Sequence, residues 1–250
     1  MNKSFLLLTA LASLIIASVP ALASHSAPKA PHTRKAEPAQ KNPDTIIVRV
    51  YGRLKTPTAE GNISQGTGFF INETTLITDY HVIADCDTIM IVWLDGKKSL
   101  ATVRSANSDC DLVSLNVTTP RADQGHVRLI ADSDTVGQNT PVIAAGYPRG
   151  EWAITNGNLT MRYVDKTGTM GVEWGSNNLL IDHGSSGSPI FNAEYQVIGI
   201  LKSKSQDGQP YECQIVTANV IWEALEITDT KDHPKGFKTG VTADLHFNDQ

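Results

Sequence analysis

Short apolar runs separated by turn residues follow one another from about residue 44 to residue 217. They are rich in β-branched and aromatic residues, which is typical of strands. The runs are TIIVRVY (45–51), GTGFFI (66–71), TLIT (75–78), TIMIVWL (88–94), LVSLNV (112–117), PVIAAGY (141–147), NLLI (178–181), SPIF (188–191), QVIGIL (196–201) and QIVT (214–217). An Asp-Gly pair in WLDGKK (93–98) predicts a hairpin. The pattern predicts an all-β barrel or sandwich.

The pattern changes on both sides of this β-rich region. The stretch ANVIWEALE (218–226) has apolar residues at near-helical spacing, so it predicts one short helix, with Thr217 as a candidate cap. Residues 24–43 are rich in Pro, Ala and Lys without apolar periodicity, which indicates a disordered linker. Residues 229–250 are polar and predict a loosely ordered tail.

Residues 1–23 have the three parts of a secretory signal peptide. Lys3 gives the basic start, residues 5–19 are an almost unbroken apolar run, and Ala21-Leu22-Ala23 supplies small residues for cleavage. The run is too short for a comfortable membrane span. We therefore expect an exported protein, periplasmic or secreted, that is not inserted in a membrane once the peptide is removed. An uncleaved N-terminal anchor is the alternative.

Charge and motif content exclude several classes of function. With Lys3 removed, 20 basic and 26 acidic residues remain, a formal net charge of −6. A nucleic-acid partner would require a basic face, so none is expected. The sequence has neither a C-x-x-C pair nor an H-E-x-x-H helix, so we expect no metal and no cofactor.

The stretch DHGSSGSPIF (182–191) packs three serines among Gly and Pro. Such residues commonly form a surface turn, but one serine could also be a nucleophile. A nucleophilic serine needs a base, usually His, and a carboxylate that fixes the tautomer of that His. His81 follows a strong apolar strand and is the candidate base. Asp111, which directly precedes the run 112–117, is the candidate carboxylate, and Asp109 is its rival.

The order His, Asp, Ser resembles that of the trypsin-like (chymotrypsin-fold) serine proteases, and in particular their bacterial HtrA-like and glutamyl endopeptidase branch. The similar pieces are GTGFFI (66–71), TDYHVIAD (78–85), DCDLVSL (109–115), ADSDTVGQNTPVIAAGYPRG (131–150) and GSSGSPIFN (184–192). The resemblance implies a protease domain over residues 44–228 with two six-stranded antiparallel β-barrels. The first barrel is expected over about 44–120 and the second over about 127–217.

The resemblance also implies the roles of the site residues. Ser186 is the third residue of G-x-S-G and therefore the nucleophile, with His81 as base and Asp111 as its orienting carboxylate. The backbone N–H groups of Gly184 and Ser186 would form the oxyanion hole, and Gly184 and Gly187 permit the backbone turns that this requires. The implied function is a serine endopeptidase that cleaves polypeptide substrates through an acyl-enzyme. A catalytically silent binding protein and a partner-activated quality-control protease are the alternatives.

Two departures from the family bear on activation and specificity. Ser185 stands where animal trypsins have the aspartate that pairs with a freed N-terminus, so we expect no activation of that kind. Leu201 stands where glutamyl endopeptidases have a histidine that binds glutamate. By the family pattern the substrate pocket is formed near Leu180, Leu201, Lys202 and Ser203. No acidic residue lies at its base, which favours a small or apolar side chain over Lys or Arg.

Three cysteines are present, Cys86, Cys110 and Cys213. If His81 approaches Asp111, then Cys86 and Cys110 are drawn into the same neighbourhood. A disulfide between these two is compatible with an oxidising compartment, and two small buried thiols are the alternative. Cys213 is expected to be free in either case.

Overall fold

The structure is a computed structural model of the 250-residue chain. It describes residues 45–59, 61–129, 132–164, 172–179, 181–204 and 212–227. The expected signal peptide, linker and polar tail lie outside these residues.

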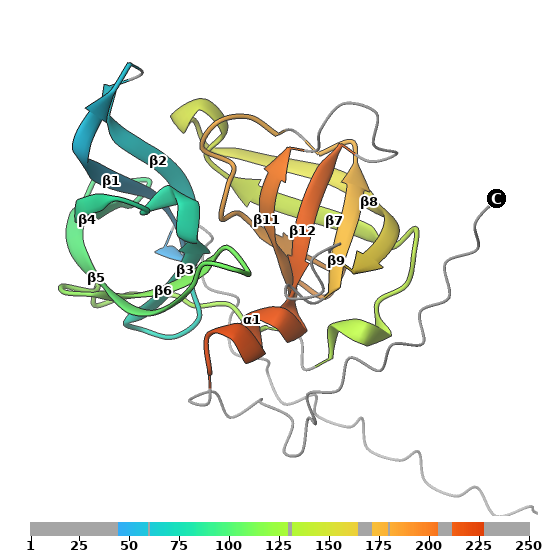
Figure 1. Ribbon diagram of the computed structural model, residues 1–250. Helices are drawn as coiled ribbons and strands as arrows, with labels where there is room; N and C mark the ends of the chain where they lie inside the picture. Colours follow the sequence, from blue (N-terminus) through green and yellow to red (C-terminus); the bar gives the residue numbers. More distant parts are fainter. Residues whose placement is uncertain are drawn as a thin grey trace, which may run out of the picture. The chain divides into compact units, whose positions relative to one another are not determined.

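Strands β1–β6 close into a first antiparallel barrel, drawn in blue to green in Figure 1. They are β1 (Ile47–Thr58), β2 (Gly61–Phe70), β3 (Thr75–Asp79), β4 (Cys86–Val92), β5 (Lys98–Asn107) and β6 (Leu112–Val117). The order around the barrel is β1-β2-β3-β6-β5-β4. A 3-10 turn, η2 (Tyr80–Val82), directly follows β3. The predicted Asp-Gly hairpin joins β4 to β5, with Gly96 at φ +83°.

Strands β7–β12 close into a second barrel, drawn in yellow to orange in Figure 1. They are β7 (Pro141–Gly146), β8 (Ala153–Val164), β9 (Val172–Asn177), β10 (Pro189–Phe191), β11 (Val197–Lys204) and β12 (Cys213–Thr217). Their order, β7-β8-β9-β12-β11-β10, repeats that of the first barrel. The predicted fold class is therefore confirmed. The sequence shows no internal repeat, so the repetition lies in the topology alone.

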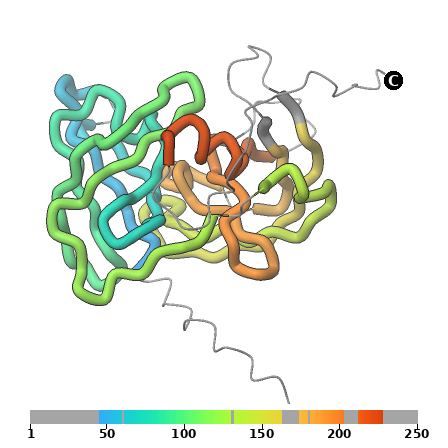
Figure 2. Tube along the Cα trace, turned by 90° about the horizontal axis from the view of Figure 1, so that it is seen from below, coloured from blue at the N-terminus to red at the C-terminus, as the bar shows by residue number. Residues whose placement is uncertain are grey.

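Each barrel has an apolar core of its own, and a further cluster joins both barrels to the helix. Trp93 and Phe70 stack inside the first barrel, and Trp174 lies inside the second. The joining cluster contains Phe69 from β2, Val216 from β12 and Trp222 from the helix. Figure 2 shows the helix, in red, next to both sets of strands. Burial of this cluster fixes one barrel against the other, because apolar surface removed from water stabilises the contact.

The helix α1 (Ala218–Ala224) lies where the sequence predicts it. Thr217 occupies the N-cap position, but its side chain makes no capping hydrogen bond. Across the described ranges, no helix is long and apolar enough to cross a membrane.

The strand predictions fail at one run and miss three strands. Residues 178, 179 and 181 of the run NLLI are not in a strand, because β9 ends at Asn177. Strands β5, β8 and β9 are absent from the predicted runs. The reason is clearest in β5, where most side chains are exposed and the apolar alternation is weak.

Candidate active site

His81 lies in the turn η2, immediately after the buried strand β3. The turn closes through hydrogen bonds from the Ile83 and Ala84 N–H groups to the Tyr80 carbonyl oxygen. Val82 of the same turn is buried in the first barrel, whereas the His81 side chain is 48% exposed. The turn thus anchors itself in the core and presents the imidazole to solvent.

Asp111 holds His81 through both of its carboxylate oxygens. Oδ2 lies 2.7 Å from His81 Nδ1, and Oδ1 accepts the His81 backbone N–H at 2.8 Å. Asp111 has φ +56°, a left-handed conformation at the end of the turn between β5 and β6. Its carbonyl oxygen also accepts the Tyr80 N–H at 2.9 Å. When Nδ1 donates to the carboxylate, Nε2 is left with a free lone pair, which is the tautomer that a general base needs.

The serine loop, residues 182–188, is folded by its own hydrogen bonds. The Ser185 N–H donates to the Asp182 carbonyl oxygen at 2.9 Å, and the Ser188 N–H donates to the Ser185 carbonyl oxygen at 3.0 Å. Ser185 is buried, and its hydroxyl accepts the Asp182 N–H. Ser185 therefore faces inward as a structural residue, while Ser186 remains partly accessible.

Two glycines are required for the path of this loop. Gly184 and Gly187 have φ +92° and +88°, which side chains rarely adopt. A Cβ atom at Gly184 would lie 2.5 Å from the Tyr147 carbonyl oxygen, and one at Gly187 would lie 2.0 Å from the Thr67 carbonyl oxygen. Both conformation and space therefore exclude other residues at these positions.

The N–H groups of Gly184 and Ser186 make no hydrogen bond to any residue that the structure describes. The N–H groups of Ser185, Gly187 and Ser188 are all used within the protein. Two unused N–H groups beside a serine are the arrangement that can stabilise a developing oxyanion.

Thr67 of β2 joins the first barrel to the serine loop. Its N–H donates to the Ser186 carbonyl oxygen at 2.8 Å, and its hydroxyl donates to the Gly184 carbonyl oxygen at 2.7 Å. The same hydroxyl accepts the Tyr147 N–H from the segment after β7. Thr67 is fully buried, and the sequence analysis gave it no role.

Ser186 and the histidine turn come together at Gly66, which precedes Thr67. A Cβ atom at Gly66 would lie 2.6 Å from Val82 Cγ2 and 3.0 Å from the Ser186 carbonyl oxygen. The structure thus places the predicted serine and the turn that carries His81 next to the same glycine. Within the described ranges, no hydrogen bond joins the Ser186 hydroxyl to the His81 ring.

Asp79 is a further acidic residue at this site that the sequence analysis missed. It ends β3, two residues before His81, and is fully buried. Burial, and after it the charge of Asp111, raises the pKa of the Asp79 carboxyl well above its usual range. In the sequence, the feature that could have pointed to Asp79 is a carboxylate at the end of an otherwise uncharged strand, two residues before His81.

A cation could be sought at Asp79, His81 and Asp111, because one potential ligand atom of each lies within 4.8 Å of the other two. Both Asp111 oxygens, however, are already hydrogen-bonded to His81. Those bonds account for the geometry of the pair, and we assign no metal to it.

The predicted pocket residues are only partly placed. Leu201 is buried in the core of the second barrel, and its backbone bonds Gly187 and Ser188 of the serine loop. Its position makes it a support of that loop. Lys202 is half-buried. Leu180 and the side chain of Ser203 lie outside what the structure describes.

The cysteines form no disulfide, so the possible Cys86–Cys110 bond is not found. Cys86 begins β4 and contacts Gly52 of β1, with its thiol near the Ala84 carbonyl oxygen. Cys110 belongs instead to the apolar cluster that joins the two barrels. The two residues flank the His–Asp pair in the sequence but pack in different places, with Cys86 partly buried and Cys110 buried.

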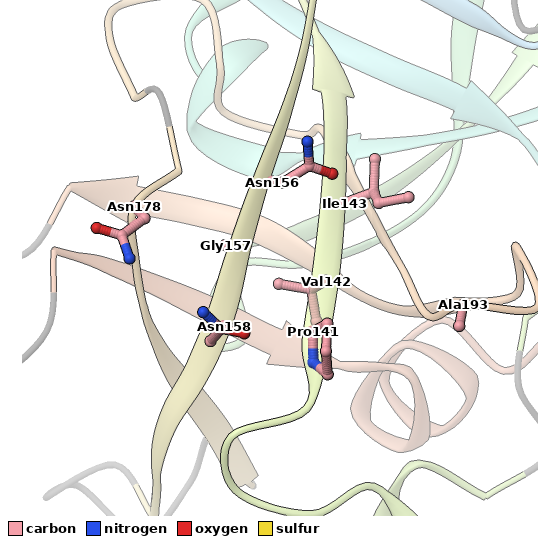
Figure 3. Close-up of a pocket in the computed structure, with 8 residues that line it drawn as sticks. All are labelled: Pro141, Val142, Ile143, Asn156, Gly157, Asn158, Asn178 and Ala193. Carbon is pink, nitrogen blue, oxygen red and sulfur yellow. The ribbon is translucent and has the colours of Figure 1, made fainter. Parts of the chain in front are cut away.

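A pocket of about 330 Å³ lies elsewhere, on the second barrel. Figure 3 shows Pro141 and Val142 of β7 and Asn156 and Asn158 of β8 among its lining residues. It contains none of the His–Asp–Ser residues and no ionisable side chain. We therefore place the candidate chemistry at the His81–Asp111 pair and the serine loop.

Residues 66–200, more than half of the chain, match the trypsin-like peptidase domain family. The chain belongs to this family. The match begins at Gly66 and includes His81, Asp111 and Ser186.

Individual relatives share only about 30% of the aligned residues with this chain. The chain is 28% identical over 225 residues to the putative serine protease HhoA of Synechocystis, covering 81% of this chain and 53% of that protein. It is 32% identical over 161 residues to the serine protease Do-like HtrA of Lactococcus lactis, covering 58% of this chain and 39% of that protein. A probable periplasmic serine endoprotease, DegP-like, of Hahella chejuensis is 29% identical over 139 residues, with coverages of 55% and 29%. The chain thus spans about a third to a half of the length of these relatives.

Solved structures share the fold. The HtrA-type protease AlgW with a tripeptide superposes with a TM-score of 0.61 at 20% identity, over 74% of this chain and 59% of that chain. The active form of the Rv3671c protease from M. tuberculosis gives the same TM-score and identity, over 73% and 80%. At this identity the likeness concerns the fold alone.

Proposed function

We propose that this protein is an exported serine endopeptidase in which Ser186, His81 and Asp111 form the catalytic triad. One observation carries the proposal: Asp111 binds both the ring Nδ1 and the backbone N–H of His81, beside a glycine-bounded serine loop. That arrangement fixes the tautomer and the orientation of the base.

The proposed reaction begins with attack of Ser186 Oγ on the carbonyl carbon of the scissile peptide bond. His81 Nε2 takes the hydroxyl proton and later gives it to the leaving amine, while Asp111 stabilises the imidazolium. The N–H groups of Gly184 and Ser186 stabilise the oxyanion, and each such donor is worth about 10²–10³ in turnover. Water then attacks the acyl-enzyme, with His81 again acting as base.

Exposed or unfolded polypeptides outside the cytoplasm are the proposed substrates. The leader-like residues 1–23 support export. Three relatives carry the words serine protease or periplasmic serine endoprotease in their names. No cofactor enters the proposed mechanism, because the triad and two backbone N–H groups supply every step.

The test is a fluorophosphonate probe, which forms a covalent adduct only with an activated serine. The purified chain is treated with the probe, and the adduct is located by mass spectrometry. We expect labelling at Ser186 and loss of labelling in Ser186→Ala and His81→Ala. Ser185→Ala is the control for the identity of the labelled serine: Ser185 is buried, so the adduct should still be found at Ser186 in this variant. Labelling of the folded protein at any other serine would refute the proposal.

A second candidate is a protease that becomes active only with a partner, or a silent binding protein on the same fold. It is favoured by one observation, namely that no hydrogen bond joins Ser186 to His81 within the described residues. The probe separates the cases. A folded protein that does not react alone but reacts after a peptide or protein ligand is added is partner-activated, and one that never reacts is a binding protein.

A further inference from the structure

Asp79 is a buried acid next to the His–Asp pair, and it has no hydrogen-bond partner among the described residues. It ends β3, where it lies in register with Leu112 of β6, and its side chain is fully buried. Neither carboxyl oxygen accepts a hydrogen bond from any described residue. The Gly187 N–H faces this carboxyl and lowers its pKa, but this effect is smaller than those of burial and of Asp111, and the same N–H donates a hydrogen bond to the Leu201 carbonyl oxygen at 2.9 Å. An ionised carboxylate in such a place is costly, because little replaces the water that it loses.

The carboxyl groups of Asp79 and Asp111 are close enough that the protonation of one affects the protonation of the other. One carboxyl oxygen of Asp79, one of Asp111 and one ring nitrogen of His81 lie within 4.8 Å of one another. Two carboxylates at this separation resist simultaneous ionisation, so the pair tends to keep one proton. The positions of the hydrogen bonds decide which oxygen carries it.

The surroundings of Asp111 stabilise an ionised carboxylate better than those of Asp79 do. The Asp111 oxygens accept two hydrogen bonds from His81, and its side chain is 16% exposed to water. Asp79 has neither advantage. The charged groups that face Asp79 are Asp111 before β6 and Lys202 of β11, and Lys202 has the smaller effect. The proton therefore belongs on Asp79.

We propose that Asp79 is a positioning residue that holds the one proton of the Asp79–Asp111 pair, so that Asp111 alone bears the negative charge that faces His81. This inference rests on the proposed function, because it concerns the orienting partner of the same histidine. Asp79 acts through Asp111 and does not touch the substrate. It keeps a second charge out of the site while its carboxyl fills the space behind the pair.

The first test compares the unfolding equilibrium of the Ser186→Ala protein with that of the same protein carrying Asp79→Asn, from pH 4 to pH 8. A proton held by folded Asp79 but lost on unfolding makes the folded state less favourable as the pH rises above about 3.9. Each pH unit then costs the parent about tenfold in folding equilibrium relative to Asp79→Asn, until folded Asp79 also ionises. Parallel curves would overturn the proposal.

Asp85→Asn is the matched control for this test. Asp85 is an exposed aspartate four residues after His81, and its φ of +57° suits Asn. Its curve should stay parallel to that of the parent. If Asp79→Asn does not fold, infrared spectra of the parent chain decide the question. A carboxylic acid band that persists at pH 7 supports the proposal, and its absence refutes it.

The second test asks which of the two carboxyl groups, Asp79 or Asp111, bears the negative charge that faces His81. The pKa of the His81 ring is followed by NMR of ¹⁵N-labelled histidine in the Ser186→Ala protein. Asp79→Asn should leave it nearly unchanged, because Asp79 is already neutral. Asp111→Asn removes the charge that faces His81, so the His81 pKa should fall in that variant. A clear fall of the His81 pKa in Asp79→Asn, or an unchanged value in Asp111→Asn, would overturn the proposal.

These readouts do not depend on catalysis. If the pH curves and the NMR titrations agree with the prediction while Ser186 never reacts with the probe, the proposed enzymatic function is wrong and the proposed protonation of Asp79 is supported. If Ser186 reacts and the pH curves are parallel, the proposed enzymatic function is supported and the proposed role of Asp79 is wrong.

Discussion

The hydroxyl of Thr67 in the first barrel donates a hydrogen bond of 2.7 Å to the carbonyl oxygen of Gly184 in the serine loop. The two residues are 117 positions apart in the chain. Because the Thr67 N–H also donates to the Ser186 carbonyl oxygen, one residue fixes the peptide unit before Ser185 and the peptide unit after Ser186. The orientation of the proposed oxyanion hole thus depends on a contact between the two barrels.

Replacing Thr67 by Val should therefore damage both stability and reactivity. The variant keeps the shape of the side chain but leaves the Gly184 carbonyl oxygen without this donor. We expect a loss of about 1–3 kcal/mol in the free energy of unfolding. The rate of fluorophosphonate labelling at Ser186 should fall as the loop loosens. Thr67→Ser, which keeps the hydroxyl, is the control and should retain most of the rate. Equal rates in the Val and Ser variants would show that the bond does not position the loop.

Replacing Asp111 by Asn should nearly abolish labelling at Ser186 without unfolding the protein. An amide accepts through one atom only, so it cannot hold both the ring and the backbone N–H of His81 in the required tautomer. We expect the labelling rate to fall by about 10³–10⁴. Asp109→Asn is the control, because Asp109 is exposed and lies two residues before Asp111. A larger loss in the Asp109 variant would reverse the assignment of the orienting carboxylate.

Replacing Gly187 by Ala should cost more than replacing Gly96 by Ala. Both glycines have left-handed backbones, with φ +88° and +83°. The conformational cost of about 1–2 kcal/mol is therefore common to both. A Cβ atom at Gly187 would strike the Thr67 carbonyl oxygen, whereas nothing lies within 4 Å of one at Gly96. Urea unfolding should show a further loss of about 1–3 kcal/mol for Gly187→Ala alone. Only that variant should lose labelling, and equal losses would contradict the packing seen here.

The parts of the site that the sequence reveals are those in which residue type alone limits the structure. A backbone position with positive φ usually requires glycine, so it can be recognised in the sequence. Serines between two such glycines can be recognised in the same way. The run 182–191 was therefore recognisable as a constrained turn. His81 and Asp111 were candidates because each adjoins an apolar strand, and the structure joins them by two hydrogen bonds.

The remaining features depend on contacts between distant segments. Thr67 is one threonine among many until the Gly184 carbonyl oxygen is placed against it. In the sequence, Asp79 resembles an ordinary aspartate at the end of a strand. Only the structure shows that the serine loop and Lys202 lie next to it. Strand β5 was not predicted, because most of its side chains face water and its sequence shows little apolar alternation. Cys86 and Cys110 both lie close to the His–Asp pair in the sequence, yet Cys86 packs against Gly52 and Cys110 belongs to the cluster that joins the two barrels.

The three thiols should differ in their reactivity in the native protein. Only a thiolate attacks an alkylating reagent, so reactivity follows pKa and exposure. Burial raises the pKa of the Cys213 thiol to about 12, and Cys110 is buried as well. Cys86 is only partly buried, and its pKa is raised by burial and then by the charge of Asp85. Alkylation at pH 8 followed by mass spectrometry should therefore find modification first at Cys86, and at the other two after unfolding in guanidinium. The same reaction tests the disulfide, because protection of both Cys86 and Cys110 in guanidinium, lifted only by a reductant, would mean that the bond forms after all.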